Sequence, residues 1–145
     1  MCIRDRNISI GIASTEGKCL IHTGGQSRTS PWGGDSPVFM DSMAEAGKSV
    51  VDALGGNILF INVMNNLSID CDCNGRPSAP DMHDIGILAS TDPVALDQAC
   101  VDLVYISDNS QSMIQRIESV GGSDTLEHGE EIGLGSRSYR LEVID

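Results

Sequence analysis

Two apolar runs on either side of a polar loop constrain this chain more than any other feature. Residues 58–64 and 85–89 are short and almost continuously apolar, which predicts strands buried on both faces of a sheet. The loop between them carries thiols, carboxylates and an imidazole. A helix that opens at Asp92 and Pro93 follows the second run directly. We therefore expect any chemistry to be concentrated between these strands.

The rest of the chain predicts helices and strands that alternate. Pro37, after the capping residues Asp35 and Ser36, predicts a helix that continues to a glycine pair at 55–56. Shorter helices are expected over 113–120 and from 123 or 124 to 132, and residues 138–144 alternate as an edge strand would. Residues 8–13 could add a further strand. This order predicts an α/β domain with helices packed on a small, mainly parallel or mixed sheet.

The beginning of the chain fits nothing that follows. Residues 1–6 resemble a non-native scar of sequence assembly, and Cys2 is set aside with them. The expected sheet is small for an α/β protein. Residues 7–145 are therefore expected to form the C-terminal part of a single α/β domain that is incomplete at its N-terminus.

Charge and length exclude several kinds of partner. Nine Lys and Arg residues against 21 Asp and Glu residues give a net charge of −12, so neither nucleic acid nor an anionic membrane surface is an expected partner. No apolar run reaches the roughly 20 residues that span a bilayer. Five cysteines, an odd number without framework spacing, indicate free thiols or ligands in a reducing cytoplasm. The sequence leaves the oligomeric state open.

Cys71 and Cys73 are the first candidate ligands. Residues two apart in an extended chain point to the same side, so both sulfurs could face one zinc or iron ion. A disulfide between them would close a strained ring. The alternative is that both are small buried apolar side chains in a turn, although the acidic residue on each side of Cys71 makes deep burial less plausible.

Two further clusters could contribute to this site. His83 and Asp84 lie where the second strand begins, and a His beside a carboxylate can be a metal ligand or an oriented base. Cys19 and His22 would complete a Cys₃His zinc set with Cys71 and Cys73, if the two clusters meet. The alternatives are a solvated loop His and ordinary capping of the loop by Asp84.

Asp97 and Trp32 each allow two interpretations. Asp97 lies one turn inside an apolar helix, so it needs a partner, and a nearby backbone or side-chain group is favoured over a cation. Trp32, in a Gly-rich loop, is expected to pack locally, with a ligand-stacking lid as the alternative. Signatures of nucleotide binding are absent: the sequence has no phosphate-binding loop that ends in Gly-Lys-Ser/Thr and no Gly-x-Gly-x-x-Gly after a strand.

Several motifs, taken in order, resemble the domain of unknown function 362 family. They cover nearly all of residues 7–145 and comprise Gly17-Lys18 with His22, Ser42-Met-Ala-Glu45, Ile61-Asn62, Cys71-Asp72-Cys73, Asp84-Ile-Gly-Ile-Leu-Ala-Ser90, Asp92-Pro-Val-Ala-Leu-Asp97 and Glu130-Glu-Ile-Gly-Leu-Gly135. The resemblance implies an α/β protein of bacteria or archaea. Many members carry a ferredoxin-type insertion with iron–sulfur motifs between positions such as His22 and Phe39. This chain has no cysteine there, and it resembles the insertion-free branch.

The resemblance also implies a longer N-terminal half, with His and Asp residues of its own. The leading hypothesis is a metal or iron–sulfur site that uses Cys71 and Cys73, with His22 and His83 as further ligands. Asp84 and Asp97 would orient ligands or exchange protons. One alternative is a metal-independent enzyme that uses a thiolate or carboxylate of the same loop on a small molecule. The other is a structural or interaction module.

Overall fold

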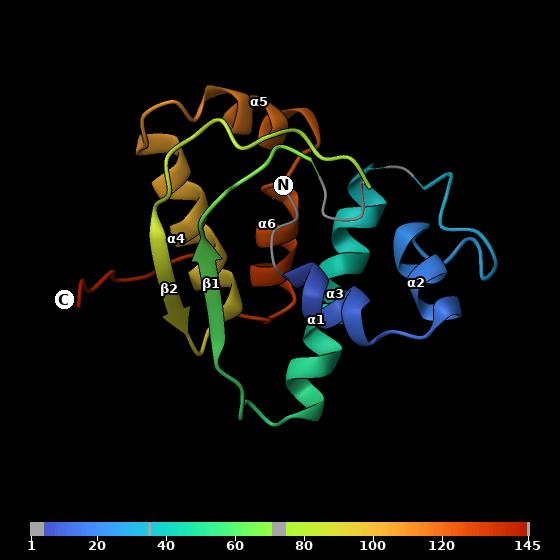
Figure 1. Cartoon of the computed structure of the whole chain (residues 1–145). Coiled ribbons are helices and arrows are strands. Elements are labelled where there is room, and N and C mark those ends of the chain that lie inside the picture. The colour runs from blue at the N-terminus through green and yellow to red at the C-terminus, as the bar shows by residue number, and fades with distance from the viewer. Residues whose placement is uncertain (1–4, 35, 71–74, 145) are drawn as a thin grey trace.

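The fold is known from a computed structural model that describes residues 5–34, 36–70 and 75–144. Within these ranges the chain forms six helices and two strands (Figure 1). In chain order they are α1 (Asp5–Ile12), α2 (Thr15–His22), α3 (Ser36–Ala53), β1 (Phe60–Met64), β2 (Gly86–Ser90), α4 (Pro93–Ile106), α5 (Gln111–Ser119) and α6 (Asp124–Glu131). The α/β class predicted from the sequence is confirmed.

The last four helices lie where the sequence predicts them. Pro37 lies in the first turn of α3, and Pro93 is the first residue of α4. Asp92 caps α4, because its Oδ1 accepts a hydrogen bond from the amide of Ala95 at 2.9 Å. Asp35, the other predicted cap of α3, lies outside the described residues. Helices α5 and α6 begin and end within two residues of the predicted positions.

The sheet differs from the prediction in its direction. Strands β1 and β2 pair antiparallel, with Ile61 opposite Ala89 and Val63 opposite Ile87, so a mainly parallel or mixed sheet is wrong for the described residues. A parallel pair needs a crossover, which is usually helical. The described part of the connection between β1 and β2 contains no helix, and the chain turns back instead.

The prediction that both faces of the strands are buried is also wrong. Asn62 and Met64 point toward α4 and are 6% and 4% exposed. Val63 and Ile87, on the opposite face, are 41% and 70% exposed. Figure 1 shows α4 behind the two strands, with no helix in front of them. The sheet therefore has one packed face and one apolar face exposed to solvent.

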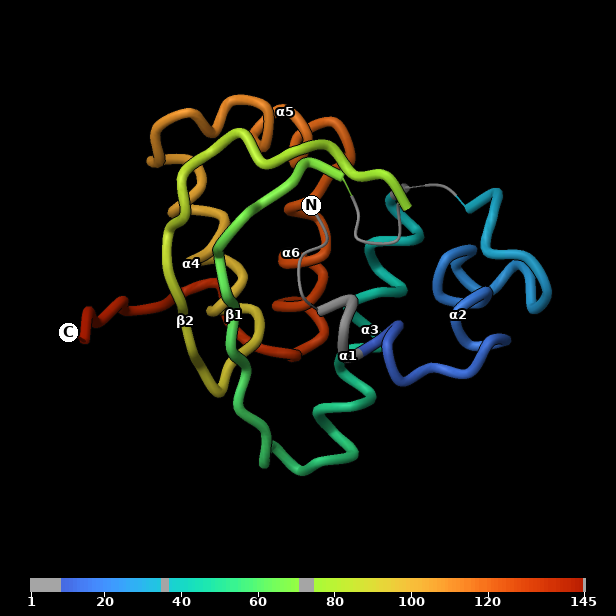
Figure 2. The backbone as a smooth tube through the Cα atoms, viewed as in Figure 1, coloured from blue at the N-terminus to red at the C-terminus, as the bar shows by residue number. Residues whose placement is uncertain are grey.

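Two predicted strands take other forms. Residues 8–12 belong to α1, which packs against α3, because tertiary contacts overrule the alternation of such a short segment. Residues 138–144 form no strand, and the chain runs outward past β2 to its C-terminus (Figure 2). Their alternating pattern lacks a hydrogen-bonded partner strand within the described chain. In addition, residues 15–22 form helix α2, which was not predicted from the sequence.

Helix α4 connects the sheet to the remaining helices. It contacts both strands on one side and α6 on the other (Figure 1). Helix α6 packs on α3, and α1 and α2 both pack against α3. Two apolar clusters result. The first lies between the sheet, α4 and α5, and the second between α4 and α6. Among the helices of the described chain, none is long and apolar enough to cross a membrane.

Candidate functional site

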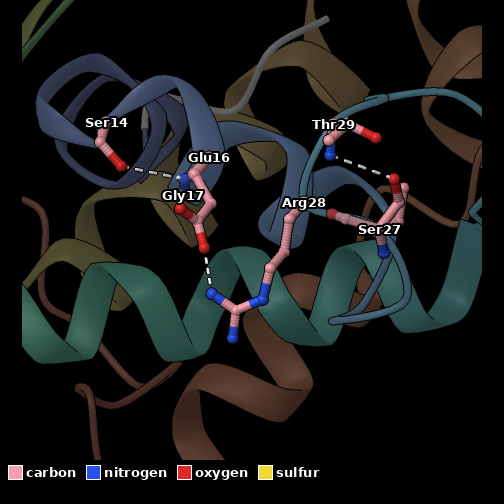
Figure 3. Close-up of polar contacts among 7 residues, drawn as sticks. Ser14, Glu16, Gly17, Ser27, Arg28 and Thr29 are labelled. Atoms are coloured by element: carbon pink, nitrogen blue, oxygen red, sulfur yellow. Dashed lines mark hydrogen bonds and ion pairs between the residues drawn. The ribbon is translucent and has the colours of Figure 1, made fainter.

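His22 is the last residue of α2, and a local hydrogen bond fixes its ring. The Oγ of Ser14 accepts from the amide of Gly17 and thereby starts the helix (Figure 3). One turn before the end, the carbonyl of Lys18 lies 2.7 Å from Nδ1 of His22. The ring also stacks on Phe39 of α3, with centroids 5.2 Å apart. The imidazole is therefore held between the end of α2 and the first turns of α3.

The proton of the His22 ring follows from this contact. A carbonyl oxygen can only accept, so Nδ1 must donate, and in the neutral ring the free lone pair lies on Nε2. Metal-ligating histidines commonly use this arrangement, in which a backbone carbonyl sets the tautomer and the other nitrogen binds the metal. In His22, Nε2 is therefore the ring nitrogen that remains free to accept.

The segment after His22 is tied back to α2. Thr23 is 2% exposed, and its Oγ1 donates to the carbonyl of Cys19 at 2.8 Å and accepts from the amide of Ser27 at 2.9 Å. Gly34 packs so closely on this helix end that a Cβ there would collide with the carbonyl oxygen of His22. Ser27 then caps the following turn through the amides of Thr29 and Ser30 (Figure 3).

Two side chains of this region, Trp32 and Arg28, are exposed to solvent and not packed. Trp32 is 83% exposed, so the prediction that it packs locally is wrong. Arg28 pairs with Glu16 of α2 across the loop (Figure 3), and because both side chains are largely exposed this ion pair adds little stability. Cys19, by contrast, is a free thiol buried to 5% exposure inside α2.

The loop that carries the candidate thiols is described at its two ends. Cys71 and Cys73 themselves lie outside the described residues. Asp70 Oδ2 accepts from both the amide and the hydroxyl of Ser78, each at 2.7 Å, and Ser68 Oγ donates to the carbonyl of Ser78 at 2.9 Å. The hydrogen bonds from Ser78 lower the pKa of the Asp70 carboxyl. These bonds close the base of the loop.

His83 and Asp84 lie at the other end of the loop, just before β2. The side chain of His83 is exposed. Asp84 accepts from Nδ2 of Asn65 at 2.6 Å and from the amide of Asn66 at 2.8 Å. Asn66 has a φ of 50°, and the Asp84 carboxylate stabilises this left-handed turn after β1. The capping of the loop by Asp84 that the sequence allowed is therefore present.

Asp97 has a partner, as its position in an apolar helix requires. The residue is 3% exposed, and its Oδ1 accepts from Nδ2 of Asn62 at 2.6 Å. The same amide nitrogen lies 3.3 Å from Sγ of Cys100. The partner is not local, because Asn62 comes from β1. A buried polar contact thus joins the inner face of the sheet to α4.

One cluster was not predicted from the sequence. His128 of α6 faces three carboxylates: Nδ1 lies 4.0 Å from Asp41 and 3.7 Å from Glu131, and Nε2 lies 3.6 Å from Glu45. The sequence contains both halves of this cluster: Asp41 and Glu45 are spaced i,i+4 on α3, and His128 and Glu131 are spaced i,i+3 on α6. Within the described ranges, no group of His, Cys, Asp and Glu has an arrangement that could hold a metal ion. The cluster therefore brings side chains of α3 and α6 together at distances that make ion pairs only when the imidazole is protonated.

Comparison with known proteins gives one match. The model of a family described as a domain of unknown function, DUF362, matches residues 5–102. The matched region begins at the first residue of α1 and extends through most of α4, so it includes His22, the loop between the strands and Asp97. No curated protein and no solved structure matches the chain significantly.

Proposed function

The chain belongs to the DUF362 family, and on that premise we propose that it binds a zinc or iron ion, or an iron–sulfur centre, through Cys71 and Cys73. His22 and His83 are the proposed further ligands. Two thiolates and two imidazoles form a set that zinc accepts, and thiolates with imidazoles also hold some iron–sulfur centres. The proposal places the centre in the loop between β1 and β2.

The observation that carries this proposal is the orientation of His22. Its Nδ1 proton is engaged by the carbonyl of Lys18, which leaves the Nε2 lone pair for a metal. Stacking on Phe39 restricts the ring further, so binding would cost less side-chain entropy than it would for a mobile surface His. His22 is on an early helix and the thiols are in a later loop, so the centre would join two separate parts of the chain.

The two candidate carboxylates would have different duties. Asp84 adjoins His83 and is held by Asn65 and Asn66, so it could orient that ligand or exchange a proton with a bound small molecule. Asp97 is buried, and it would act through Asn62 and Cys100 rather than by contact with a substrate. Thiols that remain reduced as ligands suit a cytoplasmic protein.

The test is metal content. The full chain is purified without chelator, and zinc, iron and sulfide are measured by elemental and chemical analysis. We expect near-stoichiometric metal, lost in Cys71→Ser and Cys73→Ser and reduced in His22→Ala and His83→Ala. His128→Ala is the matched control, because it removes a partly buried imidazole from the α3–α6 cluster, and it should retain the metal.

Metal far below stoichiometry that does not respond to the two cysteine substitutions would overturn the proposal. In that case, thiol alkylation separates the alternatives. A depressed thiol pKa at Cys71 or Cys73 in metal-free protein would indicate a thiol enzyme acting on a small molecule. Ordinary thiol reactivity would leave a structural or interaction module.

A further inference from the structure

The exposed face of the sheet and the C-terminal segment are apolar surfaces that lie close together. Val63 and Ile87 are cross-strand neighbours on the face turned away from α4, and both are substantially exposed. Residues 140–144 run outward from the body of the protein (Figure 1), and Leu141, Val143 and Ile144 are 49%, 83% and 93% exposed. Exposed apolar surface of this extent usually marks an interaction site.

The C-terminal segment is anchored firmly at its base. Asp92 Oδ2 accepts from the amide of Ser136 at 2.9 Å, and Glu130 Oε1 accepts from the amide of Arg137 at 2.8 Å. The hydroxyl of Tyr139 then donates to Asp102 at 2.7 Å. Beyond Tyr139, the described structure gives the segment one side-chain ion pair, between Arg140 and Glu142. Residues 140–144, which we call the arm, are therefore held in place at one end and exposed along their length.

A groove beside β2 has the chemistry that such an arm would fill. It has a volume of about 590 Å³ and lies between β2, the first half of α4 and the chain's own arm, of which Arg140, Leu141, Glu142 and Ile144 line one side of the groove and leave this volume open. Ile87 and Ala89 of β2 and Ala95 and Ala99 of α4 are among the residues that line it. Within the described chain, β2 pairs with β1 alone, so its outer edge offers backbone donors and acceptors to another strand.

We propose that two copies of this chain associate by exchanging arms, each arm lying along β2 in the groove of the other copy. Backbone hydrogen bonds to the edge of β2 would supply affinity, and the apolar side chains of the arm would enter the groove. A two-fold axis makes both contacts at once.

Charge favours a second copy as the occupant. The chain carries a net charge of −12, which opposes self-association over most of its surface. Strands β1 and β2 contain no charged residue, and the arm contains one Arg and one Glu that contact each other. The proposed contact is therefore neutral on both sides, whereas a basic partner would be drawn to the acidic surface elsewhere.

Sedimentation velocity of the full chain over a concentration series tests this proposal. We expect a dimer that dissociates on dilution. A chain that ends at Tyr139 keeps the Asp102 hydrogen bond and should sediment as a monomer wherever the full chain is dimeric. Val143→Pro should do the same in the full-length chain, since proline removes a backbone donor and disfavours strand pairing. The control Ile106→Thr removes apolar surface that is 79% exposed on α4, outside the groove, and should remain a dimer.

Hydrogen exchange locates the contact. Amides of residues 86–90 and 140–144 should become protected as the dimer forms, and those of α2 should not change. A full chain that stays monomeric at all concentrations would overturn the proposal. So would a dimer, or a larger assembly, that persists in both the truncated chain and Val143→Pro. Circular dichroism of each variant at monomeric concentration confirms that it is folded.

Discussion

At the scale of single residues, the contact that best explains a sequence feature is the pair of Asn62 and Asp97. A carboxyl group inside an apolar helix is costly without a hydrogen-bond donor, and Asn62 supplies one from the neighbouring strand. Both residues are at most 6% exposed, so water cannot replace either partner. The pair therefore fixes the position of α4 on the sheet as well as satisfying two polar groups.

Replacement of Asn62 by Ala should lower the free energy of unfolding by about 1–3 kcal/mol, because it removes a donor from a buried carboxyl group. Urea denaturation followed by circular dichroism measures the change. Asn57→Ala is the control: its amide donates to the carbonyl of Leu54 at 3.2 Å on the exposed surface. The control should change stability by no more than about 0.5 kcal/mol. Equal losses in the two variants would contradict a special role for the buried pair.

The sequence predicts which residues need partners better than it predicts the partners. Asp97 must be paired because of its place in an apolar helix, and this was foreseeable. That its partner is Asn62 depends on how α4 packs on β1, which no local pattern encodes. The cluster around His128 was not predicted from the sequence for the same reason. Its two helical pairs are visible in the sequence, but their meeting depends on the packing of α6 against α3.

At the scale of elements, helices α3 to α6 and the positions of the two strands follow from local chemistry, whereas α1, α2 and the direction of the strands do not. Pro37 and Pro93 mark the starts of α3 and α4, because a proline in the first turn costs no hydrogen bond. Strand direction depends on how the chain crosses between β1 and β2, and this crossing has no signal of its own. Apolar and polar residues alternate in both 8–12 and 138–144. The first segment nevertheless belongs to helix α1, and the second, which contains the arm, forms no strand.

Tyr139, at the base of the arm, should show this anchoring in its titration. The hydrogen bond to Asp102, followed by burial and the charge of Asp102, raises the pKa of Tyr139 to about 12. A raised pKa means that the contribution to stability is complete below the unfolded value of 10.0 and is lost as the pH rises through about 12. The arm should therefore detach from α4 only at strongly alkaline pH.

The absorbance of tyrosinate measured against pH tests this in a Tyr105→Phe background, which leaves a single tyrosine. Asp102→Ala should return the pKa of Tyr139 toward 10.0, whereas Glu118→Ala, which removes a carboxylate that bonds Tyr105 instead, should not. A Tyr139 titration that Asp102→Ala leaves unchanged would show that the hydrogen bond does not hold the arm.

At the scale of the whole molecule, α4 takes part in both apolar clusters. Cys100 and Val104 belong to the cluster with the sheet and α5, and Val94 and Val101 belong to the cluster with α6. Any change that loosens one cluster acts on a helix that the other cluster also needs. We therefore expect the sheet, α4, α5 and α6 to unfold as one cooperative unit.

Two core substitutions test this cooperativity. Met113 of α5 and Leu126 of α6 are fully buried in different clusters. Met113→Ala and Leu126→Ala should each lower the free energy of unfolding by about 2–5 kcal/mol, because each leaves a cavity. Each should also speed hydrogen exchange in the other helix, α6 or α5 respectively, since both reach exchange through the same unfolding. Leu54→Ala, at a half-exposed position after α3, should have little effect on either helix. Faster exchange confined to the substituted helix would show that the two clusters unfold separately.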